Sequence, residues 1–138
     1  MTPLLMTHFA VTWLMVGIIW MVQVVHYPLM AYTGPEHSAR YQQLHVQRMG
    51  ILVIPIMLVE AATVVLICFQ TPWVSMEWLG AVLLAAIWAV TGCVSVPSHE
   101  VLTQRFDPAV HRRLVVSNGI RAGLWSCRGL LAAQLVMA

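Results

Sequence analysis

The sequence contains no lysine, and charged residues of either sign make up only 9% of its 138 residues. An ordinary soluble domain has about 25% charged residues, whereas 60% of the residues here are hydrophobic. The net charge of +2 comes wholly from arginine and is too small to indicate a nucleic-acid partner. We therefore expect an integral membrane protein whose surroundings are the lipid bilayer.

The sequence also lacks a cysteine pattern. Its three cysteines, Cys68, Cys93 and Cys127, stand singly within apolar stretches, and no Cys-x-x-Cys spacing occurs. Neither a disulfide framework nor a thiolate metal site is therefore indicated. We expect the cysteines to be small packing residues.

Long apolar runs are abundant, in contrast, and occupy residues 4–29, 50–69, 78–97 and 114–137. Each has about the 20 residues that an α-helix needs to cross the hydrocarbon core of a bilayer. These spans leave no room for a soluble domain. The predicted fold is all-α, an integral membrane four-helix bundle in which residues 1–138 form a single transmembrane domain.

The arginines predict the orientation of the bundle, because short arginine-rich loops stay in the cytoplasm. Five arginines flank one side of the predicted bundle: Arg40, Arg48, Arg105, Arg112 and Arg113. The opposite loop, residues 70–77, and both chain ends contain no lysine or arginine. We predict that both termini lie outside and that the second and fourth helices extend into the cytoplasm.

Proline and glycine predict where the helices begin and end. The first helix is predicted to close at His26-Tyr27-Pro28, before a turn at residues 32–35, and the third is predicted to meet Pro97 at its cytoplasmic end. Asp107-Pro108 supplies an N-cap followed by a proline at the first helical position. We therefore predict that the fourth helix begins there, ahead of the membrane.

Polar side chains form one stripe on each predicted helix, all near the cytoplasmic end. Lipid cannot satisfy such groups, so we expect the stripes to face inward and meet at a cavity. The stripe on the fourth helix spans an arc of about 100°. Its members are His111, Asn118, Arg121, Trp125 and Arg128.

The histidines are the first candidates for chemistry at this cavity. A single histidine at a helix end is usually an interfacial or capping residue, and no short histidine spacing specific for a metal is present. Four histidines at one level could nevertheless bind a transition metal or provide axial ligands to haem. The candidate metal ligands are His26, His45, His99 and His111, of which His26 and His99 are also candidate cofactor-binding residues.

Other polar residues at the same level suit an oxygen-bearing ligand. Arg48, Arg121 and Asn118 could hold a carboxylate, a phenolate or a haem propionate, and with His45 they are the candidate catalytic residues. Trp125 lies on the same stripe as Asn118. Its ring is a candidate cofactor-binding surface that could wall the cavity and stack on a planar ligand.

Glu60 and Arg128 lie near the middle of the predicted bilayer. Counted from the cytoplasmic boundary, the depth of Glu60 lies within about 6 Å of both Arg121 and Arg128, so it could pair with either. The charges could be a structural ion pair between the second and fourth helices. They could equally be a counter-ion to a substrate or part of a proton relay.

Scattered motifs along most of the chain resemble the anthrone-oxygenase-like family of small four-helix membrane proteins. The matching residues are His26-Tyr27-Pro28, Arg48-Met49-Gly50 with Pro55, Pro97-Ser98-His99 with Leu102, and His111 with Asn118 and Arg121. His99 stands where that family typically has asparagine. A more distant similarity is to the small haem-binding protoporphyrinogen oxidases of bacteria. Both resemblances imply oxidation of a planar, membrane-soluble molecule, and we expect the inner membrane of a bacterium.

Three hypotheses follow. The first is an oxidoreductase or oxygenase that acts on a planar lipophilic substrate with a metal, with haem or with a metal-free histidine base. The second is a carrier or channel whose charged path is formed by Glu60, Arg121 and Arg128. The third is a structural subunit. Small residues such as Gly80 and Ala85 on the third helix could also let copies of the chain associate.

Overall fold

The computed structural model describes residues 2–73 and 75–137, which form helices joined by short connections. Two of these helices are interrupted by five-residue π-helical segments, labelled η1 and η2. The elements in chain order are α1 (Pro3–Met21), η1 (Val22–His26), α2 (Tyr27–Met30), α3 (Pro35–Cys68), α4 (Met76–Val90), η2 (Thr91–Ser95), α5 (Val96–Leu102) and α6 (Pro108–Met137). Since η1 and η2 continue directly into their neighbours, the elements make four rods.

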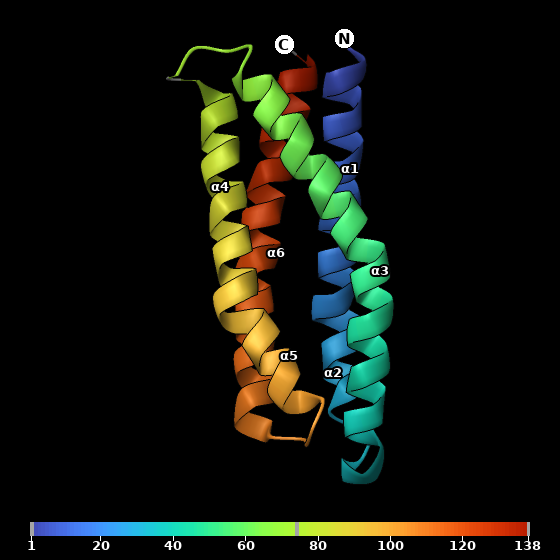
Figure 1. The fold of residues 1–138 in the computed structure, drawn as a ribbon. Coiled ribbons are helices and arrows are strands. Elements are labelled where there is room, and N and C mark those ends of the chain that lie inside the picture. The colour runs from blue at the N-terminus through green and yellow to red at the C-terminus, as the bar shows by residue number, and fades with distance from the viewer. Residues whose placement is uncertain (1, 74, 138) are drawn as a thin grey trace.

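The four rods run alternately up and down (Figure 1). Both termini and the connection from α3 to α4 lie at one end, while the connections from α2 to α3 and from α5 to α6 lie at the other. The rod of α1 packs against α3 and α6, and α4 packs against the same two helices. The predicted all-α four-helix bundle is thus confirmed.

Three of the rods are long and apolar enough to cross a membrane: Pro3–Met30, Pro35–Cys68 and Met76–Leu102. Helix α6, with 30 residues, is equally long but is interrupted by polar residues. Its Asn118, Arg121 and Arg128 side chains are buried inside the bundle. The predicted membrane character is therefore supported directly for three rods. In α6, these three polar side chains face the neighbouring rods instead of the surroundings.

Two predicted helix ends were wrong, and π-helical turns explain both. The first rod continues past Pro28 to Met30, and the third continues past Pro97 to Leu102. A proline has no N–H to donate to the preceding turn. In each rod a π turn comes just before the proline and the backbone bond spans five residues, from Tyr27 N–H to Val22 and from Val96 N–H to Thr91. The wider turn lets the helix continue through the proline.

Two other predicted boundaries, the turn before α3 and the start of α6, agree with the structure. Gly34 adopts a φ of 74° immediately before α3, a conformation that glycine reaches without strain. At the start of α6, the Asp107 carboxylate accepts hydrogen bonds from the N–H groups of Ala109 and Val110, at 2.9 and 3.2 Å. Asp107 therefore caps the helix as its sequence position indicated.

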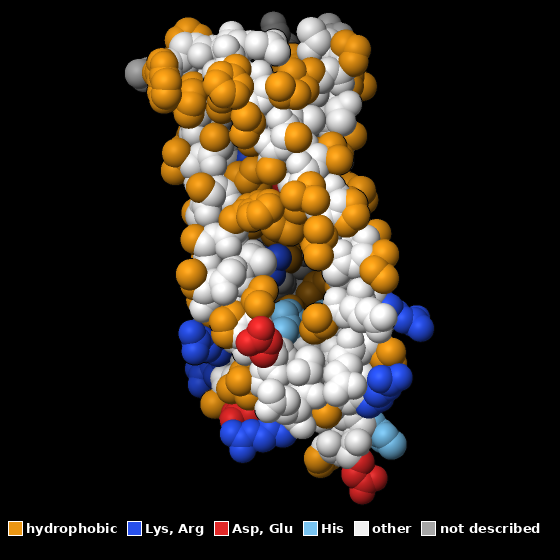
Figure 2. Space-filling model, in the orientation of Figure 1, with side chains coloured by type: hydrophobic (Ala, Val, Ile, Leu, Met, Phe, Trp, Pro, Cys, Tyr) orange, Lys and Arg blue, Asp and Glu red, His pale blue; other side chains and the backbone are white. Residues whose placement is uncertain are grey.

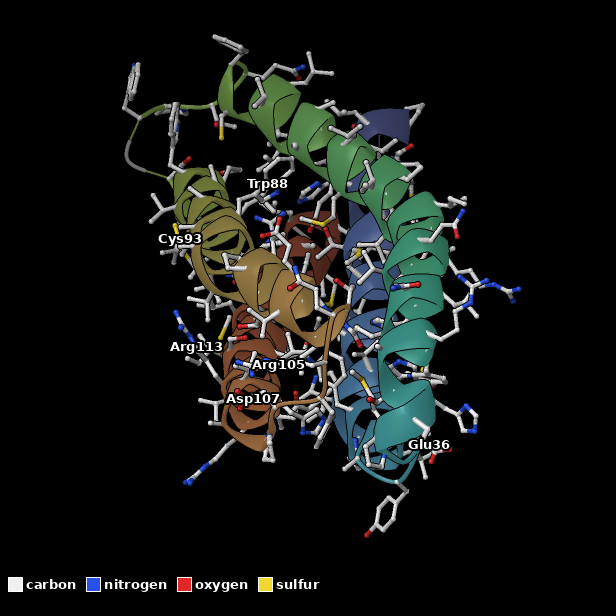
Figure 3. All side chains as sticks on the ribbon, turned by 60° about the horizontal axis from the view of Figure 1, so that its bottom comes forward. Glu36, Trp88, Cys93, Arg105, Asp107 and Arg113 are labelled. Atoms are coloured by element: carbon white, nitrogen blue, oxygen red, sulfur yellow. The ribbon has the colours of Figure 1, made fainter. Side chains whose placement is uncertain are left out.

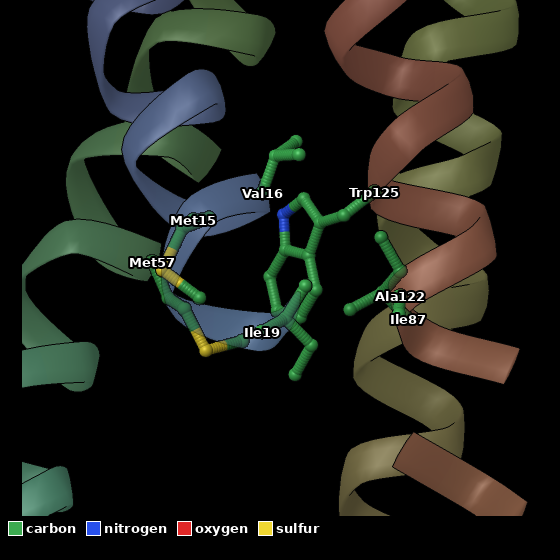
Figure 4. Packing of buried hydrophobic residues seen from close by; sticks show 7 residues of the cluster. All are labelled: Met15, Val16, Ile19, Met57, Ile87, Ala122 and Trp125. Carbon is green, nitrogen blue, oxygen red and sulfur yellow. The ribbon is translucent and has the colours of Figure 1, made fainter. Parts of the chain in front are cut away.

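The central core joins the four rods around Trp125 (Figure 4). This side chain extends from α6 towards α1 and is fully buried. The cluster consists of Met15, Val16, Ile19, Met57, Ile87, Ala122 and Trp125. It separates two groups of polar residues, one around Glu60 and one around a cavity nearer the arginine-rich end.

Candidate functional site

A cavity of about 260 Å³ lies among the rods in the half of the bundle that contains α2 and α5. Figure 2 shows a hollow in the lower half of the molecule, with histidine and cationic side chains visible at its edge. Most of the lining is apolar, from residues such as Met15, Val53 and Met57. The polar lining residues are Tyr27, His45, Thr91, Ser95, His99, Asn118 and Arg121.

Arg121 is the most unusual residue of this lining. It is only 7% exposed, yet its guanidinium forms no ion pair and no hydrogen bond with the residues that the structure describes. Its single stabilising contact of note is the face of the Trp125 ring, 5.4 Å away. Burying a cation without a partner raises the free energy of the folded protein, because the charge loses its hydration and gains no compensating contact. Its position on a cavity wall therefore indicates a site for an anionic or strongly polar oxygen.

A hydrogen-bonded chain ends in the cavity at Tyr27. The Gln42 amide N–H donates to Nδ1 of His99, and Nε2 of His99 lies 3.2 Å from the Tyr27 hydroxyl oxygen. A neutral His99 that accepts at Nδ1 carries its proton on Nε2 and donates it to Tyr27. In this tautomer of His99, with Gln42 as the donor, the hydroxyl hydrogen of Tyr27 is free to bond a ligand oxygen.

His111 bonds the backbone of Tyr27. Its Nε2 donates to the backbone carbonyl oxygen of Tyr27 at 3.1 Å, and His111 is not among the residues that line the cavity. Tyr27 itself is 2% exposed and directly follows the π turn of η1. His99 and His111 therefore position the tyrosine through its hydroxyl and its backbone respectively.

His45 lies between the cavity and a second, outer groove of about 370 Å³. It forms no hydrogen bond with any residue described, so its ring nitrogens remain available to a ligand. On the groove side its ring stacks on His26, with centroids 4.1 Å apart and planes at 19°. Nδ1 of His26 in turn lies 3.3 Å from the Tyr41 hydroxyl. His45 is thus the histidine best placed to act as a base.

The predicted metal site finds no support in this arrangement. Among the described residues no three His, Cys, Asp or Glu side chains are placed to hold one ion. The stacked rings of His26 and His45 direct their nitrogens along nearly parallel planes, so they do not converge on a common point. Both nitrogens of His99 are already bonded to Gln42 and Tyr27, and Nε2 of His111 is bonded to the Tyr27 carbonyl oxygen.

Two further predicted site residues do not line the cavity. Arg48 is exposed and lies in the outer groove beside His26, where its charge keeps access to water. Trp125 does not wall the cavity, because the core covers its ring and its N–H is turned to Glu60. Asn118 does line it, and its Nδ2 donates to Gln23 Oε1 at 2.8 Å while its Oδ1 has no partner among the described residues.

The charges deeper in the bundle form a separate, satisfied network. Glu60 pairs with Arg128 at 2.9 Å, and not with Arg121. Thr12 donates to the Glu60 carboxylate at 3.0 Å, and the Trp125 N–H donates to it at 3.1 Å. Arg128 also donates to the Gly80 carbonyl oxygen. One network thus joins all four rods, which favours the structural interpretation of this ion pair over a charged transport path.

The fold and site together define a small helical membrane protein with a largely apolar cavity that opens between the rods and, among the described residues, one buried unpaired cation at its wall. No protein-family model, curated protein or solved structure matches the chain. The resemblance to the anthrone-oxygenase-like family therefore stays a prediction. Sequence reasoning missed Tyr27 and Gln42 as site residues, although Gln42 lies three residues before His45 on the same helix and so shares its face.

Proposed function

We propose that the protein is a membrane oxidoreductase or oxygenase that acts on a planar lipophilic molecule with a carbonyl or phenolic oxygen. The observation that carries this proposal is Arg121, a buried cation on the wall of an apolar cavity with no hydrogen-bond or ion-pair partner among the described residues. In the proposed topology all four rods cross the inner membrane of a bacterium. Both termini lie outside, and the first turns of α3 and α6 lie in the cytoplasm.

Different cavity residues would bind the ring system and the oxygen of the substrate. The apolar walls, including Met15 and Met57, suit flat hydrocarbon rings that partition from the bilayer. Arg121 and the Tyr27 hydroxyl would hold the substrate oxygen by charge-assisted and neutral hydrogen bonds. Asn118 Oδ1, which lacks a partner among the described residues, would accept a hydrogen bond from a neighbouring hydroxyl group.

The proposed reaction begins with proton transfer to His45. Removing a proton from the ring carbon of an anthrone moves negative charge to the oxygen held by Arg121 and Tyr27. The resulting enolate is electron-rich and is oxidised by molecular oxygen. For an anthrone, one oxygen atom forms the second carbonyl of the anthraquinone and the other leaves as water, which balances the reaction.

The test is turnover of anthrone by the purified protein in nanodiscs, measured as anthraquinone absorbance and oxygen consumption. Tyr27→Phe removes one hydrogen bond to the developing oxyanion, so we expect its rate to fall about tenfold, the equivalent of one such bond. Tyr32→Phe, at an exposed position that lines neither the cavity nor the outer groove, is the matched control and should retain the wild-type rate. A wild-type rate no higher than the rate in empty nanodiscs would refute the proposed function.

A further inference from the structure

A second surface feature lies on the outer side of the bundle, where α6 packs beside α4 and η2. It is a groove of about 390 Å³ that shares no lining residue with the cavity lined by Arg121. Its floor is formed by valine and isoleucine side chains, and two arginines lie at one end. The residues that matter here are Val90, Val94, Val116, Ile120, Arg112 and Arg113.

The two arginines have no side-chain partner in the part of the chain that the structure describes. Arg112 and Arg113 are both exposed, and neither forms an ion pair or a side-chain hydrogen bond within residues 2–73 and 75–137. In Figure 3, Arg113 lies at the outer edge of the bundle on the same side as Cys93 of η2. The two guanidinium groups therefore present unneutralised positive charge at one end of the apolar groove.

The groove has a charged end and an apolar end, in the same order along the membrane normal as the headgroup and acyl chains of a phospholipid. Arg112 and Arg113 lie in the first turns of α6, at the end of the bundle where the arginines gather. Ile120 lies eight residues after Arg112, which corresponds to about 12 Å along the helix axis. Val116 and Ile120 are 56% and 52% exposed. The charged end is thus followed by an exposed apolar strip that runs into the membrane-spanning part of the rods.

We propose that this groove binds one anionic phospholipid. Its phosphate would lie against Arg112 and Arg113, and one acyl chain would lie along Val90, Val94 and Val116. The charge complementarity favours an anionic headgroup over a zwitterionic one, because two cations without carboxylate partners face it. The apolar floor favours a complete lipid over a soluble phosphate. This site is independent of the proposed chemistry in the cavity lined by Arg121.

Native mass spectrometry of the detergent-released protein tests the headgroup. We expect a single phosphatidylglycerol to be retained about 30-fold more tightly than phosphatidylcholine with the same chains, from two juxtamembrane arginines. The Arg112→Gln/Arg113→Gln variant should lose this preference. The matched control, Arg40→Gln/Arg105→Gln, removes the same charge from exposed positions outside the groove and should keep it. Equal retention of both lipids by the wild type, or equal losses in both variants, would overturn the proposal.

A second variant tests the acyl-chain part without altering charge. Val116→Trp places a large ring in the groove, so retention of phosphatidylglycerol should fall although both arginines remain. Leu130→Trp, at an exposed position of α6 outside the groove, should bind the lipid as the wild type does. Unchanged retention by Val116→Trp would show that the lipid does not lie in the groove and would refute the site.

Discussion

Replacing Arg128 with methionine is expected to lower the free energy of unfolding by about 3–5 kcal/mol, the usual cost of breaking a buried ion pair. The Glu60 carboxylate is fully buried and would lose its cation, although Thr12 and Trp125 would still donate to it. Denaturation in mixed detergent micelles, followed by circular dichroism, measures this difference.

Two further variants distinguish the loss of this ion pair from a general effect of removing a positive charge on stability. Arg48→Met removes a cation that is exposed, so its stability should stay close to wild type. The double variant Glu60→Gln/Arg128→Met removes both charges and should recover most of the lost stability, because no uncompensated charge remains buried. If Arg128→Met were no less stable than Arg48→Met, the ion pair would not be a structural support.

The His45→Ala variant is expected to oxidise anthrone 10²- to 10⁴-fold more slowly, roughly the contribution of a general base. No described residue engages the His45 ring by a hydrogen bond, whereas both nitrogens of His99 have partners. Substrate affinity should change little, because in the proposed complex Arg121 and Tyr27 still hold the substrate oxygen. Steady-state rates and binding isotherms for the same preparation measure both quantities.

A control and a rescue accompany this variant. His37 is exposed in the first turn of α3, so His37→Ala should turn over anthrone at the wild-type rate. Imidazole added to His45→Ala should restore part of the rate by entering the space left by the side chain. A wild-type rate of anthrone oxidation by the His45→Ala protein would exclude His45 as the base.

Much of the fold could be predicted from the sequence because membrane-spanning helices have a strong signal in length and composition. The cap at Asp107 was likewise predictable, since it depends on neighbouring residues alone. The helix ends at Pro28 and Pro97 were not. A proline usually ends a helix, but π turns at η1 and η2 shift the backbone bonding by one residue and let both rods continue.

The site was predictable only in part, because helical phase gives the direction of a side chain but not its partner. Phase placed Asn118 and Arg121 on an inward stripe, and both line the cavity. It could not decide which arginine pairs with Glu60, since both lie at similar depth. Which arginine pairs with Glu60 depends on how α3 and α6 pack. The structure pairs Glu60 with Arg128, so Arg121 has no carboxylate partner among the described residues.

The measurement that tests the role of Arg121 most directly is the ionisation of a bound hydroxyanthraquinone, whose colour reports its protonation state. Next to an unpaired guanidinium the ionised oxygen is stabilised, so binding to the wild type should lower the pKa of the ligand. In Arg121→Gln the same apolar cavity without its cation should raise that pKa. A ligand pKa that rises on binding to the wild type would show that Arg121 does not hold the substrate oxygen.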